Sequence, residues 1–366
     1  MLVCLSTFIL WLPFILKLPN WFGLKIEPPS FDYIYRNYDG PLYIIPAKTL
    51  YQIDKIDIPK KGMILSLGVG AKYFAAHLPG YPFFIRIFAP FFGYLKSMVG
   101  VNILFTIFLS LFFYYFLIKL KLTKNPLLLV AVFLFLPRFL IVRSIGAPES
   151  LFILLTLLSL FLFEKENYFL SGLFGALACM TKTPGLLLFV AYFLVIVEKL
   201  LHKQKFNWRW VAILLIPAGL LSVFLIYWKQ FGDFLAYFHS GDNIHLVFPY
   251  SVFNFQKVWV NTPWLEEIIF YFFMYSLTVI SLKGIKQRSF FYYGLVFFVA
   301  STFVQHRDIS RYTLSLWPLA CIAFEKFFTS KKFIIACIII LPAIYLYSWN
   351  FLLSNLMPIA DWAPFL

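Results

Sequence analysis

Asp39 lies within the densest group of polar and aromatic residues in the chain, which runs from Phe31 to Tyr43. A carboxylate held in aromatic, poorly hydrated surroundings is well placed to act as a general base. Because Asp39 directly precedes Gly40-Pro41, it is equally a candidate N-cap of a short helix, and the two roles do not exclude each other. Asp32 is either a second acid of the same site or a solvated loop residue, and we favour the loop residue.

Basic residues gather where apolar stretches end, on the side of the membrane expected to carry Asp39. They are Arg138, Arg143, Lys182, Arg307 and Arg311. Arg and Lys form charge-assisted hydrogen bonds to phosphoryl oxygens, so this set suits a phosphate whose hydrophobic tail lies in the bilayer. A lipid-phosphate leaving group needs such stabilisation, and an incoming hydroxyl needs a base. Simple ion pairs are the alternative, of Arg138 with Glu149 and of Asp308 with its neighbouring arginines.

Further polar residues expected on this side are candidates for binding the acceptor: Asp32, Tyr43, His77, Tyr81, Glu149, His239 and His245. His77 and Tyr81 fall in a Pro- and Gly-containing segment, for which an interfacial turn with an aromatic-belt residue is the simpler interpretation. His239 and His245 flank Asp242, but their spacing matches no strong metal motif, so a loop or acceptor-binding role is favoured. We expect no metal and no cofactor, and the chain carries no nucleotide-binding signature.

The composition indicates which elements must position these residues. Of the 366 residues, 62% are hydrophobic and only 13% are charged, whereas soluble domains carry about 25% charged residues. This excludes an ordinary soluble enzyme, a disordered chain and a disulfide-stapled module, and the four cysteines all lie in apolar runs. The net charge of +15 comes from short basic clusters between apolar stretches rather than from one solvated face, which argues against a nucleic-acid binder.

An all-α polytopic membrane protein is therefore expected, with a single membrane-embedded domain over residues 1–366. A bilayer crossing needs about 20 apolar residues. About eleven stretches are candidates, several of them short: Leu2–Leu18, Val99–Ile118, Pro126–Val142, Leu151–Phe163, Tyr168–Met180, Gly185–Val197, Trp210–Trp228, Leu265–Leu282, Phe290–Val304, Tyr312–Phe324 and Phe333–Phe351. We interpret the first as a retained helix rather than a signal peptide, because no basic residue precedes it.

Basic residues in alternate short connections set the expected orientation. Most of the basic residues in short connections lie near Lys121, Lys165, Lys203, Lys286 and Lys331, in one of the two alternating sets. This predicts a cytoplasmic N-terminus. The long segments 19–98 and 229–263 then lie outside as two outer loops, the first of them folded. Because the chain contains no Asn-x-Ser/Thr sequon, we expect a prokaryotic cell membrane rather than the endoplasmic reticulum.

Several short motifs, in order along most of the chain, resemble the GT-C integral membrane glycosyltransferases, and most closely the PIG-V-like mannosyltransferases. They are residues 36–43 (RNYDGPLY), 78–84 (LPGYPFF), 148–155 (PESLFILL), 171–178 (SGLFGALA), 181–186 (TKTPGL), 231–236 (FGDFLA) and 310–318 (SRYTLSLWP). Tyr38 stands where that family commonly has Trp, and Lys182 where it usually has Arg. The stretch around His77 replaces an acidic residue and Phe-Phe that relatives often show.

The resemblance implies a GT-C-like helix bundle and a polyprenyl- or dolichyl-phosphate sugar donor. It also implies transfer of a hexose such as mannose to an acceptor hydroxyl on the outer or luminal face, with inversion at the sugar carbon. Asp39 corresponds to the general base of the first outer loop.

Two interpretations from other classes stay open. A transporter or lipid-carrier flippase would show repeated halves and ionisable groups near mid-membrane, neither of which is evident. A catalytically inactive scaffold would turn Asp39 into a helix cap away from every cavity.

Overall fold

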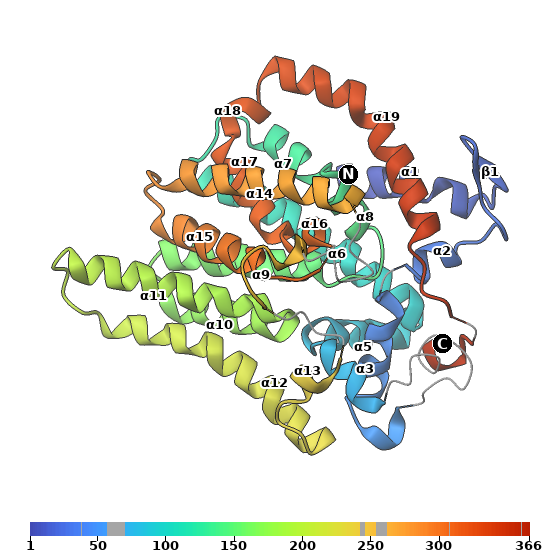
Figure 1. The fold of residues 1–366 in the computed structure, drawn as a ribbon, viewed down its shortest axis with the longest axis horizontal. Coiled ribbons are helices and arrows are strands. Elements are labelled where there is room, and N and C mark those ends of the chain that lie inside the picture. Colours follow the sequence, from blue (N-terminus) through green and yellow to red (C-terminus); the bar gives the residue numbers. More distant parts are fainter. Residues whose placement is uncertain (38, 57–69, 242–245, 254–261, 307, 360) are drawn as a thin grey trace.

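The computed structural model describes the chain from Met1 to Leu366 except residues 38, 57–69, 242–245, 254–261, 307 and 360. Helices make up most of it, and β1 and β2 form one small antiparallel hairpin (Figure 1). In chain order the elements are α1 (Leu2–Ile15), β1 (Asn20–Trp21), β2 (Leu24–Lys25), α2 (Asp32–Tyr35), η1 (Gly40–Tyr43), α3 (Ile44–Thr49), η2 (Ile53–Lys55), η3 (Ala71–Ala76), α5 (Gly80–Phe92), α6 (Tyr94–Lys119), α7 (Pro126–Leu134), α8 (Pro137–Val142), α9 (Glu149–Glu164), α10 (Tyr168–Thr181), η4 (Thr183–Gly185), α11 (Leu186–Leu201), η5 (Trp208–Leu214), α12 (Leu215–Phe231), α13 (Ala236–His239), η6 (Ser251–Phe253), α14 (Thr262–Leu282), α15 (Arg288–Thr302), α16 (Ile309–Tyr312), η7 (Leu314–Leu316), α17 (Trp317–Ala323), α18 (Glu325–Phe328), α19 (Lys331–Ser354) and η8 (Ala363–Phe365).

Five helical stretches within the described residues are long and apolar enough to cross a bilayer. They are Tyr94–Lys119, Thr183–Leu201, Trp208–Phe231, Leu265–Leu282 and Lys331–Ser354. Shorter apolar helices cover Leu2–Ile15, Tyr168–Thr181 and Leu314–Ala323. The chain is thus an all-α protein of the multi-pass membrane type, but the expected number of about eleven spans is not confirmed.

Two of the predicted spans consist of shorter helical pieces. The stretch 126–142 breaks into α7 and α8, because Pro137 has no backbone N–H to donate to the preceding turn and so begins a new helix. The stretch 312–324 likewise consists of the end of α16, the short η7 and then α17, which has Pro318 at its first turn. Each of these pieces is too short to cross a bilayer alone.

Helix α9 forms the centre of the bundle. Nearly all of its side chains are buried, and it packs against α6, α10 and α15. Helix α10 also packs closely against α12. The absence of a side chain at Gly219 permits this, since a Cβ there would lie only 2.7 Å from Cα of Ala176. In Figure 1, α10, α11 and α12 form the lower left part of the molecule, while α19 runs across the top toward α1.

The described part of the first outer segment, 19–98, folds into short helices and the β1–β2 hairpin rather than into a span. It lies close against the bundle at Gly80, the first residue of α5, where a Cβ would lie 2.4 Å from Oγ1 of Thr181 at the end of α10. The start of α5 therefore lies directly against the turn that carries Lys182.

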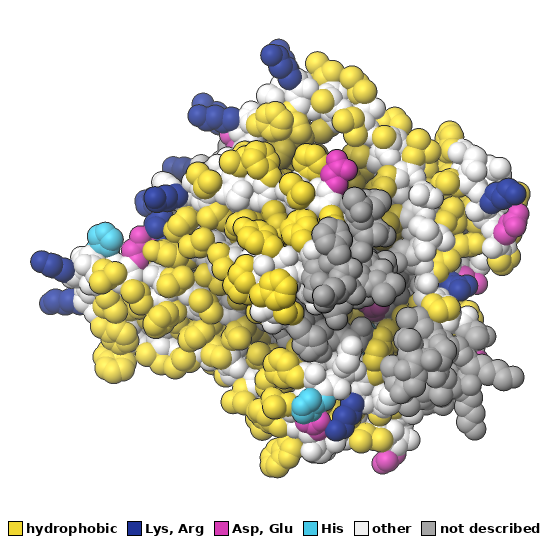
Figure 2. All heavy atoms as spheres, in the orientation of Figure 1, with side chains coloured by type: hydrophobic (Ala, Val, Ile, Leu, Met, Phe, Trp, Pro, Cys, Tyr) yellow, Lys and Arg dark blue, Asp and Glu magenta, His cyan; other side chains and the backbone are white. Residues whose placement is uncertain are grey.

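Charged residues are distributed unevenly over the surface. Figure 2 shows most of the visible Lys and Arg side chains at the left and upper left, at helix ends far from α3 and α5, with apolar side chains covering the space between. This is the distribution expected of a chain that crosses a bilayer. The cytoplasmic position of the N-terminus stays a prediction.

Candidate functional site

Two adjoining cavities lie around the turn that carries Lys182, and the smaller of them is closed on one side by the first outer segment. The larger has a volume of about 460 Å³ and a mainly apolar lining, which includes Phe152, Leu186 and Phe297. The smaller has a volume of about 80 Å³, and half of its lining is polar. Both cavities share one wall, made of Lys182, Thr183, Pro184, Tyr237, Arg311 and Tyr312. A hydrophobic chain fits the first cavity and a polar group the second.

Asp39 lines the smaller cavity, and its side chain is 47% exposed. It precedes η1, yet its side chain makes no capping hydrogen bond; instead Oδ2 lies 3.5 Å from Nη1 of Arg311. The backbone beside it is fixed by a close approach, since a Cβ at Gly40 would lie 2.9 Å from the carbonyl oxygen of Gly146. The carboxylate is therefore directed at a cation and a cavity, and it does not cap η1. The condition set for an inactive scaffold, a capping Asp39 away from every cavity, is not met.

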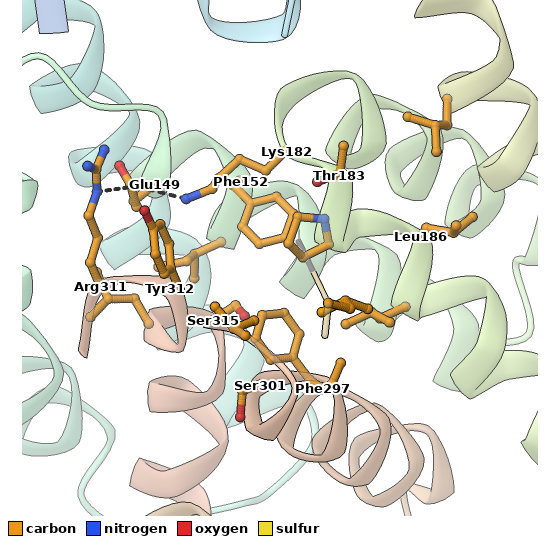
Figure 3. Close-up of a pocket in the computed structure, with 18 of the residues that line it drawn as sticks. Glu149, Phe152, Lys182, Thr183, Leu186, Phe297, Ser301, Arg311, Tyr312 and Ser315 are labelled. Carbon is orange, nitrogen blue, oxygen red and sulfur yellow. Dashed lines mark hydrogen bonds and ion pairs between the residues drawn. The ribbon is translucent and has the colours of Figure 1, made fainter. Parts of the chain in front are cut away.

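Glu149 joins the two cations of the shared wall. Its Oε1 accepts hydrogen bonds from Nζ of Lys182 and from Nε of Arg311, each at 2.8 Å, and Figure 3 shows both side chains converging on it at the edge of the larger cavity. Glu149 and Arg311 are buried and Lys182 is nearly so. Asp39, Glu149, Lys182 and Arg311, which we call the cavity cluster, hold two negative and two positive charges.

Local backbone structure explains where the two cations point. Lys182 is the extended residue that ends α10 and precedes η4. The following turn is tight, because a Cβ at Gly185 would lie 2.5 Å from the backbone nitrogen of Cys179. Arg311 lies on the short helix α16, and its backbone N–H donates to the carbonyl of Asp308. The carboxylate of Asp308 pairs with Arg138 from α8, which ties α16 to the bundle.

Tyr43 and His77 complete the smaller cavity on the side of Asp39. Their rings meet edge to face, with centroids 4.7 Å apart, and both are buried. Burial lowers the pKa of His77 to about 4, the nearby Asp39 opposing the shift and Arg311 adding to it. Burial also raises the pKa of Tyr43 well above 10. At neutral pH both groups are uncharged and can offer hydrogen bonds only as neutral partners.

The structure brings together some of the predicted phosphate-binding residues and not others. Lys182 and Arg311 meet beside Asp39. Arg143 lies elsewhere and lines neither of the two cavities: it is fully buried and donates to the carbonyl of Leu134 and to the hydroxyls of Ser6 and Thr7 on α1.

Arg138 also lies away from both cavities, with its guanidinium 4.4 Å from the ring centroid of Phe351. The expected ion pairs are exchanged as well. Asp308 pairs with Arg138 rather than with Arg311, and Glu149 pairs with Arg311 and Lys182 rather than with Arg138. Arg307 lies outside the described residues.

The predicted acceptor-binding residues divide in the same way. Tyr43, His77 and Glu149 line a cavity. Tyr81 is buried behind Tyr43 and donates to the carbonyl of Met98, and Asp32 is exposed at the start of α2.

His239 lies on the surface, where its Nδ1 is 2.9 Å from Oδ2 of Asp233, which also accepts from Lys72. These two hydrogen bonds lower the pKa of Asp233 to about 2. His245 and Asp242 lie outside the described residues. Within the described part of the chain, no group of three or more His, Cys, Asp or Glu side chains is arranged to hold a metal ion.

Three wall residues were missed by the sequence analysis. Thr183 and Tyr237 form a hydrogen bond at 3.1 Å that links η4 to α13, and Tyr312 places its ring 5.7 Å from Nζ of Lys182. All three directly adjoin or lie within the motifs that were quoted, but a tyrosine in so aromatic a chain gives no signal of its own. Comparison with known proteins adds no family: no protein-family model matches the chain, and no curated protein matches it either.

Proposed function

We propose that this protein transfers a sugar, a hexose such as mannose, from a polyprenyl- or dolichyl-phosphate donor to an acceptor hydroxyl at the outer face of the membrane. One observation carries the proposal. The carboxylate of Asp39 and the guanidinium of Arg311 meet where a polar cavity adjoins an apolar one. This arrangement suits a substrate that has a hydrocarbon tail, a phosphate and a sugar in that order.

The apolar cavity would take the first isoprene units of the donor, since Phe152, Leu186 and Phe297 are typical of a hydrocarbon-binding wall. The phosphate would lie against Lys182 and Arg311, which Glu149 already holds in position. The sugar would then reach the smaller cavity beside Asp39.

In the transfer step the acceptor oxygen attacks the anomeric carbon of the sugar while Asp39 takes the proton of the acceptor hydroxyl. The bond between the anomeric carbon and the phosphate oxygen breaks, and that oxygen keeps the electron pair. Lys182 and Arg311 stabilise the negative charge that develops on the phosphate. Attack opposite the leaving phosphate inverts the anomeric carbon.

The test is the Asp39→Asn variant in proteoliposomes that contain radiolabelled polyprenyl-phosphate hexoses, with octyl hexosides as acceptors. Because a positioned general base contributes about 10²- to 10⁴-fold, we expect product formation to fall by about 1,000-fold while insertion and thermal stability stay unchanged. Equal product from wild type and Asp39→Asn would remove Asp39 as the base. Movement of the labelled donor across the bilayer without any glycosidic product would favour a lipid-carrier flippase instead.

A further inference from the structure

His77 is the group in the smaller cavity that the transfer step leaves unused. Its side chain is only 3% exposed, and it lines the cavity together with Asp39 and Tyr43. Its Nδ1 is buried and has no hydrogen-bond partner among the residues that the structure describes. Buried polar atoms without a partner are rare in folded proteins and weaken them, so such an atom beside a cavity points to a ligand.

The position of this imidazole is fixed by the backbone rather than by its own nitrogens. The carbonyl of His77 accepts a hydrogen bond from the hydroxyl of Tyr51, and the carbonyl of Ala75 accepts one from Tyr227 at 2.9 Å. The ring itself packs against Tyr43, and the ring of Tyr73 lies 5.9 Å away between centroids. The ring is thus held at the cavity without using Nδ1.

The charge state of His77 restricts what it can bind. Asp39 and Arg311 are the charged groups that influence it, and burial outweighs both, so the imidazole is neutral above a pKa of about 4. A neutral imidazole has one donor and one acceptor nitrogen. It is a poor partner for a phosphate, for which Lys182 and Arg311 are available, and a good partner for a hydroxyl, which both donates and accepts.

We propose that His77 determines sugar specificity by forming a hydrogen bond, through a ring nitrogen, with one hydroxyl of the sugar held in the smaller cavity. This inference rests on the proposed function and assigns the two ends of the site: phosphate at Lys182 and Arg311, uncharged sugar at His77 and Tyr43. The hydroxyl belongs either to the donor sugar or to a sugar acceptor, and the experiment separates the two.

The experiment measures binding to the purified full-length protein in detergent. The donor probes are polyprenyl phosphate, its mannosyl, glucosyl and galactosyl forms, and forms lacking a single sugar hydroxyl. The acceptor probes are the corresponding octyl hexosides. We expect the wild type to bind one hexose form about tenfold more tightly than the form that lacks one particular hydroxyl. In His77→Phe this difference should vanish, and His77→Gln should restore part of it.

Two controls keep the result interpretable. His77→Phe replaces an unpartnered nitrogen with hydrocarbon, so its melting temperature should equal or exceed that of the wild type. Tyr51→Phe removes the hydroxyl that holds the His77 backbone but no atom of the cavity, so it should lower the melting temperature and leave the hydroxyl preference intact.

The inference is overturned if His77→Phe keeps the preference, if it weakens binding of every probe equally, or if the wild type shows no hydroxyl preference in either series. In the last case polyprenyl phosphate without a sugar still tests the proposed function separately, because its binding should depend on Lys182 and Arg311. If the wild type binds no polyprenyl phosphate at all, the proposed function and this inference fail together.

Discussion

The cavity cluster and the surroundings of Arg143 both bury a guanidinium group, but they satisfy it in different ways. Arg143 donates to a carbonyl and two hydroxyls, all of them neutral and all within the packed interface of α1 with the segment 134–143. Arg311 instead lies between two carboxylates, Asp39 and Glu149, and lines both cavities.

This difference shows why burial alone does not identify a functional cation. The partners of Arg143 are part of the fold, so losing them means losing packing between helices. Arg311 keeps Glu149 as a fixed partner and contacts the half-exposed Asp39 at a longer distance, 3.5 Å against 2.8 Å. A cation that is held on one side and faces a cavity on the other can accept a new anion without disturbing the bundle.

Arg311→Gln should give the largest change among these arginines. We expect the affinity for polyprenyl phosphate and the rate of transfer to fall by about 100-fold, because a charge-assisted hydrogen bond to the phosphate is lost. The comparison variant is Arg311→Lys, which keeps the charge and should retain more of both. Unchanged affinity in Arg311→Gln, measured with the sugar-free lipid, would place the phosphate elsewhere.

Arg143→Gln should affect stability instead of binding. Removing the buried guanidinium takes away three hydrogen bonds, those to the Leu134 carbonyl and to the hydroxyls of Ser6 and Thr7, which should destabilise the protein by about 3 kcal/mol. Thermal unfolding in detergent measures this change. The affinity for polyprenyl phosphate of the folded fraction should match that of the wild type. A selective loss of that affinity would break the contrast with Arg311.

A further effect, which appears only when the pH is lowered, concerns the stability of the wild type. His77 stays neutral in the folded protein down to a pKa of about 4, whereas in the unfolded chain it takes up a proton near pH 6.5. Between these values the unfolded state binds more protons, so stability should fall as the pH drops from 6.5 to 4, by up to roughly 3 kcal/mol. Melting temperatures of wild type and His77→Phe across this range test it. The variant should lose this part of the pH dependence, and parallel curves would contradict the burial of a neutral imidazole.

Several residues that meet at the two cavities could be picked out from the sequence, but their geometry could not. Asp39, Lys182, Arg311 and His77 stand out because charged and polar residues are rare in a chain that is 62% hydrophobic. Their meeting depends on how the fold brings together η1, the end of η3, the turn between α10 and η4, and α16, and residues more than a hundred positions apart give no local signal of that. Arg143 shows the reverse case. Its residue type and its position in the sequence matched those of the other predicted cations, but in the structure two of its partners lie on α1 and it reaches neither cavity.

Composition by itself determined that this chain is a helical membrane protein, because 62% hydrophobic residues in long runs leave few other ways to satisfy the backbone in a bilayer. The lengths of the helices were decided by the folded structure, where the apolar stretch 126–142 breaks at Pro137 into two short helices that hydropathy alone counts as one span. Tertiary packing also decided which cations face a cavity. A side chain's type fixes its charge, whereas only the arrangement of neighbouring helices fixes which partner that charge finds.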